Sequence, residues 1–309
     1  VYVSLVAESL LIGLRLMKDM NASLVQTNRS KIYIYLNPMI IMRVILITGF
    51  PHSGTTVVQK ILAETPEVEL FYGKDEEGNN IVGEMDNRFF SHKIRELHQR
   101  RIDEIEYAEI MEQEEPEYAD FILAKDPMFH KFFLEGDYKD YIKIFMIRNP
   151  LFVFSSLNKR FDYDIPSEQG VQKYIDTVQS FNDLRENPIE NVYTIRYEDC
   201  FENNFENLTN ILKGIGIETN DSLFERGEVK RDSEDSKEIP SSMKEGLEHT
   251  EYRTWQINQP LRNMNDYNKL DLKWEQINHL LDSKEVLKAY PELVEMMDRT
   301  LHGEVNIRV

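Results

Sequence analysis

A short loop in the chain has the residue types and spacing of a phosphate-binding loop. In the stretch ITGFPHSGTTVVQKIL an apolar run ends at Gly49, and Gly54 follows with four residues between them. Glycines at this spacing let backbone N–H groups converge at the start of a helix, where the helix dipole favours an anion. The spacing therefore predicts that the loop, with Pro51, His52 and Ser53 in it, binds a phosphate-like group.

The residues after Gly54 argue against one common use of such a loop. A nucleotide-hydrolysing P-loop carries lysine and then serine or threonine at this point, to hold the terminal phosphates and magnesium. This chain carries Thr55 and Thr56 instead. We therefore expect a donor other than ATP, bound by both threonines without a metal ion.

A second candidate anion site follows another apolar run. In KIFMIRNPLFVFSS, Arg148 ends the run and Ser156 comes eight residues later. Arginine offers a planar fork of donors to a phosphate, and a serine hydroxyl early in the following helix can add another. Ser155 is a competitor, but the spacing favours Ser156. The sequence thus predicts two separate anion sites.

The two motifs together resemble those of the sulfotransferases. PHSGTT is similar to the loop with which that family binds the 5′-phosphosulfate of 3′-phosphoadenosine 5′-phosphosulfate (PAPS), and Arg148 with Ser156 is similar to its 3′-phosphate motif. TIRYED resembles a family turn whose tyrosine lies by the adenine, which implies a cofactor contact at Tyr197; a core tyrosine is the alternative. The resemblance implies a PAPS-dependent sulfotransferase that releases adenosine 3′,5′-bisphosphate (PAP).

The same resemblance implies three candidate catalytic residues. The family usually has lysine or arginine where this chain has His52, to stabilise the leaving oxygen, and we expect the anionic cofactor to favour a protonated imidazole. Capping of the loop is the alternative role. Lys125, in FILAKDP, would add positive charge from the acceptor side. IVGEMDNRFF resembles the segment that carries the base in carbohydrate-directed members, so Glu84 is the first candidate base, with His92 and His130 as rivals.

Alternating strands and helices must position these residues. Apolar runs predict strands over 43–49, 68–73, 121–127, 141–150 and 191–200. Helices are predicted over 55–65, 92–120, 151–161 and 204–217, and from 274 onward. Strands that alternate with helices indicate a parallel sheet. We therefore expect a three-layer, P-loop-type α/β domain, in which helices flank a central parallel sheet.

Two segments lie outside this alternation of strands and helices, residues 1–40 and residues 225–253. VYVSLVAESLLIGLRL is apolar but carries charges, and it is shorter than the about 20 residues of a membrane span. We expect residues 41–309 to form a single domain, and residues 1–40 to be a peripheral helix or a segment outside the native product. The polar and charged residues of 225–253 indicate a loop. The resemblance implies that one of its basic side chains closes over the 3′-phosphate; the candidates are Arg226, Lys230, Arg231 and Arg253.

Composition limits the partners. The chain has 309 residues and a net charge of -19, which disfavours binding to nucleic acid. With one cysteine, Cys200, the chain can form no disulfide within itself, which favours a reducing compartment, and we expect a cytoplasmic protein without an integral membrane span.

Two other functions stay open on the sequence alone. One is a P-loop kinase of a small metabolite, and the other is a nucleotide-binding module without activity. For a sulfotransferase we expect a small-molecule or glycan acceptor. Glu84 favours a carbohydrate or another aliphatic alcohol, because an alcohol needs a base more than a phenol does.

Overall fold

The computed structural model describes the greater part of the predicted domain. The described residues are 43–71, 76–79, 90–111, 113, 118–127, 138, 140–160, 168–219, 257–258, 263, 265–267, 270, 272 and 274–295. They fall into two compact units. One contains Arg95–Tyr118, and the other contains the sheet and the helices that flank it.

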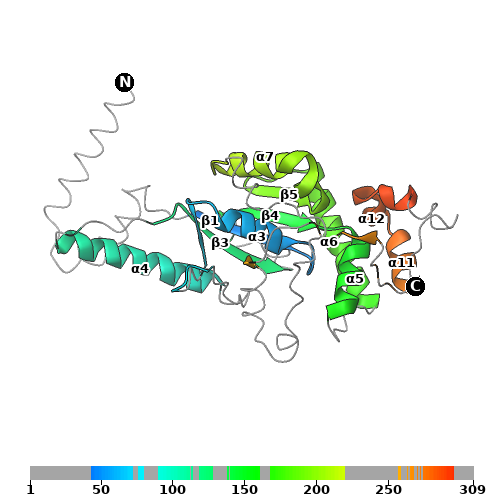
Figure 1. Ribbon diagram of the computed structural model, residues 1–309, viewed down its shortest axis with the longest axis horizontal. Coiled ribbons are helices and arrows are strands. Elements are labelled where there is room, and N and C mark those ends of the chain that lie inside the picture. Colours follow the sequence, from blue (N-terminus) through cyan, green and yellow to red (C-terminus); the bar gives the residue numbers. More distant parts are fainter. Residues whose placement is uncertain are drawn as a thin grey trace, which may run out of the picture. The chain divides into compact units, whose positions relative to one another are not determined.

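Five parallel strands form the sheet, in the order β2-β3-β1-β4-β5 (Figure 1). The strands are β1 (Arg43–Gly49), β2 (Val68–Leu70), β3 (Phe121–Pro127), β4 (Ile142–Ile147) and β5 (Val192–Arg196). The central strand β1 is buried at every position after Arg43, as expected for an apolar run inside a parallel sheet. The predicted strands are all present, and the predicted α/β class is confirmed.

Helices follow the strands in sequence. The unit that contains the sheet has α3 (Thr55–Ala63), α5 (Pro150–Arg160), α6 (Glu168–Glu186), the 3-10 helix η4 (Glu198–Phe205), α7 (Glu206–Ile215), α11 (Trp274–Leu281) and α12 (Lys284–Ala289). The prediction over 204–217 is close to α7, which ends where Gly216 adopts a left-handed conformation with φ 95°. The sequence did not single out α6.

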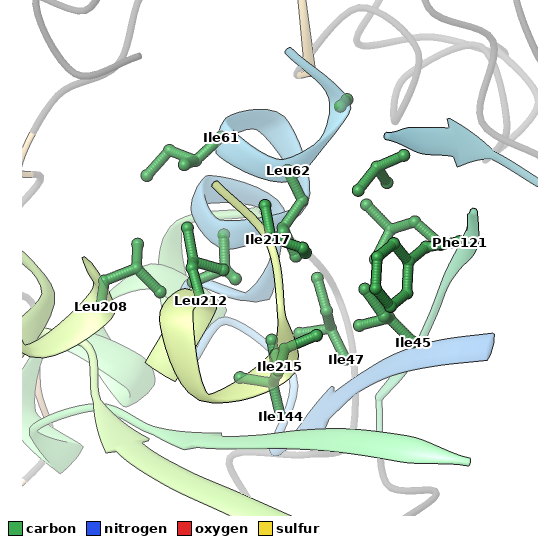
Figure 2. Close-up of a cluster of buried hydrophobic side chains, with 14 of the residues drawn as sticks. Ile45, Ile47, Ile61, Leu62, Phe121, Ile144, Leu208, Leu212, Ile215 and Ile217 are labelled. Carbon is green, nitrogen blue, oxygen red and sulfur yellow. The ribbon is translucent and has the colours of Figure 1, made fainter. Parts of the chain in front are cut away.

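One face of the sheet is covered by α3 and α7. Alternate side chains of the strands point to this face, among them Ile45 and Ile47 of β1 and Ile144 of β4 (Figure 2). They pack with Leu62 of α3 and Leu212 of α7 in one buried cluster. This cluster fixes α3, and with it the loop that precedes α3, against the end of β1.

Aromatic side chains form the core on the opposite face. Phe145 of β4 lies 5.8 Å from Phe181 of α6, between ring centroids. Phe50, at the end of β1, lies 6.1 Å from Phe154 of α5 and 5.2 Å from Tyr174 of α6. The sheet therefore lies between two helical layers, which confirms the predicted three-layer arrangement.

The connections after β1 and β4 leave the sheet in opposite directions. The connection through α3 leads from β1 towards β2, and the connection through α5 and α6 leads from β4 to β5 at the other edge of the sheet. Neighbouring strands whose connections leave in opposite directions open a crevice, in which α/β proteins bind ligands. Both predicted anion motifs follow these two strands.

Among the described residues, the unit that contains Arg95–Tyr118 is mainly helix α4 (Phe90–Ile110), whose first residues belong to the unit with the sheet. The predicted helix over 92–120 is therefore too long at its carboxyl end. Tyr118 lies beyond the helix, where its hydroxyl donates a hydrogen bond to Glu104 and its ring lies 4.4 Å from the Arg101 guanidinium. None of the described helices is both long and apolar enough for a membrane span.

Candidate functional site

The loop between β1 and α3 has the backbone geometry of an anion site. Ser53 N–H donates to the Phe50 carbonyl at 3.1 Å, and Gly54, with φ 85°, is the N-cap residue of α3. The first turn of α3 carries no acidic side chain. Since the first N–H groups of a helix have no partner within it, they can bind an anion at this end.

Tyr197 explains why position 54 must be glycine. A Cβ atom added to Gly54 would lie 2.1 Å from Cδ2 of the Tyr197 ring. The ring is only 1% exposed and comes from the turn after β5. Tyr197 thus lies directly against the loop, and its predicted contact with adenine stays a prediction.

A hydrogen bond joins the two predicted anion motifs. His52 Nδ1 and Ser156 Oγ lie 2.8 Å apart, and Arg148 Nη1 donates to the His52 carbonyl at 3.3 Å. His52 itself has φ 67°, a conformation that is uncommon outside glycine. Ser156 is partly exposed, whereas Ser155 is buried at 4% exposure. The two motifs, far apart in the sequence, therefore meet at His52.

Lys125 brings positive charge to the start of α3. It lies in β3 opposite Ile47 of β1, and its Nζ donates to Thr56 Oγ1 at 2.8 Å. The side chain is 5% exposed. The sequence placed Lys125 at the acceptor side, and the structure puts its ammonium group beside the first turn of α3.

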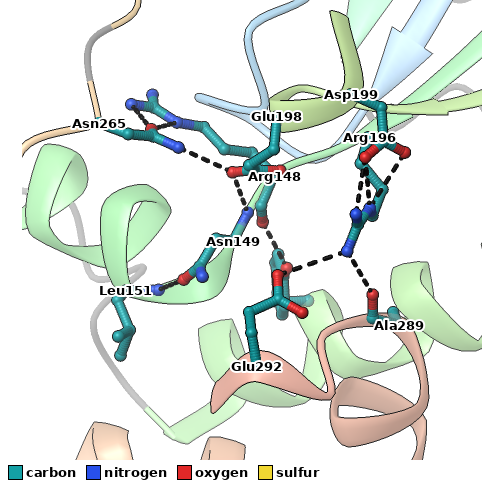
Figure 3. A network of polar contacts seen from close by, with 10 residues as sticks. Arg148, Asn149, Leu151, Arg196, Glu198, Asp199, Asn265, Ala289 and Glu292 are labelled. Carbon is teal, nitrogen blue, oxygen red and sulfur yellow. Dashed lines mark hydrogen bonds and ion pairs between the residues drawn. The ribbon is translucent and has the colours of Figure 1, made fainter. Parts of the chain in front are cut away.

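Arg148 is held on several sides. Its guanidinium carbon lies 4.4 Å from the centre of the Tyr197 ring and 5.6 Å from that of Phe152. Nε and Nη2 donate to Asn265 Oδ1 at 2.8 and 2.6 Å (Figure 3). The Tyr174 hydroxyl donates to the Arg148 carbonyl at 2.6 Å. Asn265 had no signal in the sequence, because nothing links it to a strand end or a motif.

Glu198 supports this arrangement from behind. Its Oε1 accepts hydrogen bonds from the Asn149 backbone N–H at 3.0 Å and from Asn265 Nδ2 at 2.9 Å (Figure 3). Burial raises the pKa of the Glu198 carboxyl, and the hydrogen bonds and Arg148 oppose this shift. The Glu198 carboxylate thus lies on the other side of Asn265 from Arg148, the predicted phosphate-binding arginine.

Two hydroxyl groups, one in β1 and one in the loop that follows it, belong to fully buried residues. The Oγ atom of Ser53 and the Oγ1 atom of Thr48 are buried, and neither has a hydrogen-bond partner among the described residues. Buried hydroxyls are normally paired, so an acceptor supplied by a ligand would complete the Ser53 site. The described residues contain no group of three or more His, Cys, Asp or Glu side chains that could hold a metal ion.

Several predicted residues lie outside the described part of the chain. These are Glu84, His130, Arg226, Lys230, Arg231 and Arg253. His92 lies in α4, but its side chain is not among those described.

Comparison with known families identifies the class of protein. A sulfotransferase family model matches residues 44–221, which is more than half of the chain. The chain therefore belongs to the sulfotransferase family, and the resemblance drawn from the two motifs is confirmed. No curated protein is similar enough in sequence to count as a match.

Solved structures with a similar fold are distant in sequence. Mouse sulfotransferase SULT7A1 complexed with PAP is 13% identical with a TM-score of 0.44, over 86% of this chain and 92% of that chain. The sulfotransferase domain of the Synechococcus PCC 7002 olefin synthase is 15% identical with a TM-score of 0.39, over 80% and 94%. Retinol dehydratase in complex with retinol and PAP is 16% identical with a TM-score of 0.32, over 60% and 64%. At these values the likeness adds nothing to the assignment of site residues.

Proposed function

We propose that this protein transfers the sulfonyl group of PAPS to an acceptor hydroxyl or amine and releases PAP, without a metal ion. The observation that carries the proposal is the contact between the two anion motifs, through the His52–Ser156 hydrogen bond and the donation from Arg148 to the His52 carbonyl. PAPS has a phosphosulfate at the 5′ position and a phosphate at the 3′ position. A donor of this kind matches two neighbouring anion sites in a protein of the sulfotransferase family.

Each motif takes one end of the donor in this proposal. The loop Pro51–Thr56 binds the 5′-phosphosulfate through backbone N–H groups, the Ser53 hydroxyl and the threonine hydroxyls. Arg148 and Ser156 bind the 3′-phosphate. Tyr197 supports the loop at Gly54 and borders the adenine. The distant structures crystallised with PAP agree with this choice of donor.

Sulfonyl transfer requires charge stabilisation at one side of the sulfur and a base at the other. The acceptor oxygen forms a bond to sulfur as the bond from sulfur to the bridging oxygen breaks, and the electron pair of that bond stays on the PAP phosphate. His52 and Lys125 stabilise this developing charge from the loop and from β3. Glu84 takes the acceptor proton. Because a sulfonyl group carries less charge than a phosphoryl group, these side chains can act without magnesium.

Glu84 also suggests the class of acceptor. An aliphatic alcohol hardly ionises at neutral pH, so its transfer depends on a base more than the transfer to a phenol does. We therefore propose a carbohydrate or another aliphatic alcohol as the acceptor.

Acceptor-dependent release of PAP tests the proposed function. The protein is incubated with PAPS and EDTA, together with a panel of sugars, aliphatic alcohols, phenols and amines, and the products are separated by chromatography. We expect PAP and a sulfated acceptor in equal amounts, with the alcohols as the better substrates. Magnesium-dependent transfer of phosphate from ATP to the same panel, with no use of PAPS, would instead identify a kinase.

A further inference from the structure

The clearest feature that the proposed function does not use is the pair of residues next to Arg148, Asn265 and Glu198. Asn265 belongs to a segment far along the chain from both anion motifs, yet its side chain lies between Arg148 and Glu198 (Figure 3). Tyr267 fixes this segment to α5, because its ring lies 4.8 Å from that of Phe152. Residues 265–267 therefore take part in the site through packing as well as through hydrogen bonds.

The orientation of the Asn265 amide is determined by its neighbours. Its oxygen accepts from Arg148 Nε and Nη2, and its nitrogen donates to Glu198 Oε1. Arginine can only donate and an ionised carboxylate can only accept, so the opposite orientation would lose all three hydrogen bonds. Asparagine is thus the residue type that satisfies both charged neighbours at this position.

For phosphate binding by Arg148, it matters whether the oxygen that accepts its hydrogen bonds is charged or neutral. Nε and Nη2 form the edge with which arginine makes bidentate bonds to carboxylates and phosphates. A carboxylate at this edge would neutralise the guanidinium and so weaken its attraction for a phosphate. The amide oxygen of Asn265 fixes the same edge without adding charge. The negatively charged carboxylate of Glu198 lies on the other side of Asn265. It accepts hydrogen bonds there from Asn265 Nδ2 and from the Asn149 backbone N–H.

We propose that Asn265 is a positioning residue for the 3′-phosphate: it fixes the Arg148 guanidinium with a neutral oxygen, and Glu198 in turn fixes Asn265. This inference rests on the proposed function, since it assumes that Arg148 binds the 3′-phosphate of the donor. Asn265 does not touch the donor in this arrangement. Asn265 sets the orientation of the Arg148 guanidinium, which binds the phosphate, and leaves its positive charge in place.

The ratio of two dissociation constants measures this role. Calorimetry gives the dissociation constants of PAP and of adenosine 5′-monophosphate. Their ratio measures the preference for a 3′-phosphate, because effects of a substitution on the rest of the nucleotide site cancel in it. In Asn265→Asp we expect this preference to fall about 10-fold or more, because a carboxylate then pairs with Arg148. In Asn265→Ala we expect a smaller fall of about 3-fold, because Arg148 loses its anchor but keeps its charge.

Asn182 provides a matched control. It is more buried than Asn265, at 3% exposure, and its Nδ2 likewise donates to a carboxylate, Glu285 Oε2, at 3.1 Å. Asn182→Asp therefore also places two carboxylates together, at a site where α6 meets α12. We expect its preference for PAP to stay within about twofold of that of the wild type.

The outcomes separate this inference from the proposed function. A wild type that binds PAP no better than adenosine 5′-monophosphate would contradict the proposed function, and the inference with it. A wild type that prefers PAP, with an unchanged preference in Asn265→Asp, would refute the role of Asn265 alone. If Asn265→Asp does not fold, Asn265→Ala decides, and a preference equal to that of the wild type refutes the role.

Discussion

Replacing Arg148 by alanine should weaken the binding of PAP by about 100-fold, which corresponds to about 3 kcal/mol. Arg148 is the charged donor of the second anion motif, and its position is fixed by the Tyr197 ring and by Asn265. A phosphate bound to it would lose charge-assisted hydrogen bonds in the variant. Binding of adenosine 5′-monophosphate, which lacks the 3′-phosphate, should change far less. Calorimetry with the two nucleotides measures both effects.

Arg148→Lys is the control for charge. Lysine keeps the positive charge but lacks the planar fork, so it cannot reproduce the paired bonds to Asn265 Oδ1 or to a phosphate. We expect an affinity for PAP between those of the wild type and the alanine variant. Circular dichroism should confirm that both variants fold. If Arg148→Ala weakens both nucleotides equally, Arg148 serves the structure of the site and does not read the 3′-phosphate.

Replacing Gly54 by alanine should lower the free energy of unfolding by about 2–5 kcal/mol. A left-handed conformation costs a residue with a side chain about 1–2 kcal/mol. The added Cβ would also lie 2.1 Å from the Tyr197 ring, and over-packing of this kind costs about 1–3 kcal/mol. Relief of the clash must move Tyr197 or the loop, so binding of PAP should weaken as well. Unfolding in urea measures the change in stability.

Gly78→Ala separates the two costs. Gly78 has nearly the same φ, 83°, but an added Cβ there meets no described atom within 4 Å. This variant should lose only the about 1–2 kcal/mol of the left-handed conformation and bind PAP normally. Equal losses in Gly54→Ala and Gly78→Ala would show that Tyr197 does not restrict the loop.

The central sheet could be predicted from the sequence because its signals are local. β1, β3 and β4 consist mostly of apolar residues. The predicted anion motifs also follow strand ends, and the parallel pairing of β1 with β4 brings Arg148 near the loop. Lys125 was predicted only as an acceptor-side residue, and its bond to Thr56 depends on the pairing of β3 with β1.

Helix α6 was missed because its sequence is mixed. EQGVQKYIDTVQSFNDLRE places its apolar residues on one side but carries many polar and charged residues. Its buried side chains, among them Tyr174 and Phe181, have their partners on β4 and α5 and after β1. Tertiary contacts of this kind leave little trace in a local pattern.

The contacts around Arg148 could not be predicted for a related reason. Asn265 and Glu198 come from different parts of the chain and meet only in the folded protein. An asparagine in a polar stretch gives no sign of a partner. The hydrogen bond between His52 and Ser156 is similar, since each residue was predicted from its own motif and the contact between them was not.

Calorimetry with PAP and with ATP, both in EDTA, tests the central claim most directly. The account holds that the site recognises a nucleotide with a 3′-phosphate and needs neither a metal ion nor a third phosphate at the 5′ end. It predicts that PAP binds at least about 100-fold more tightly than ATP, in keeping with the effect expected for Arg148. Tighter binding of ATP, or binding of PAP only when magnesium is added, would contradict it.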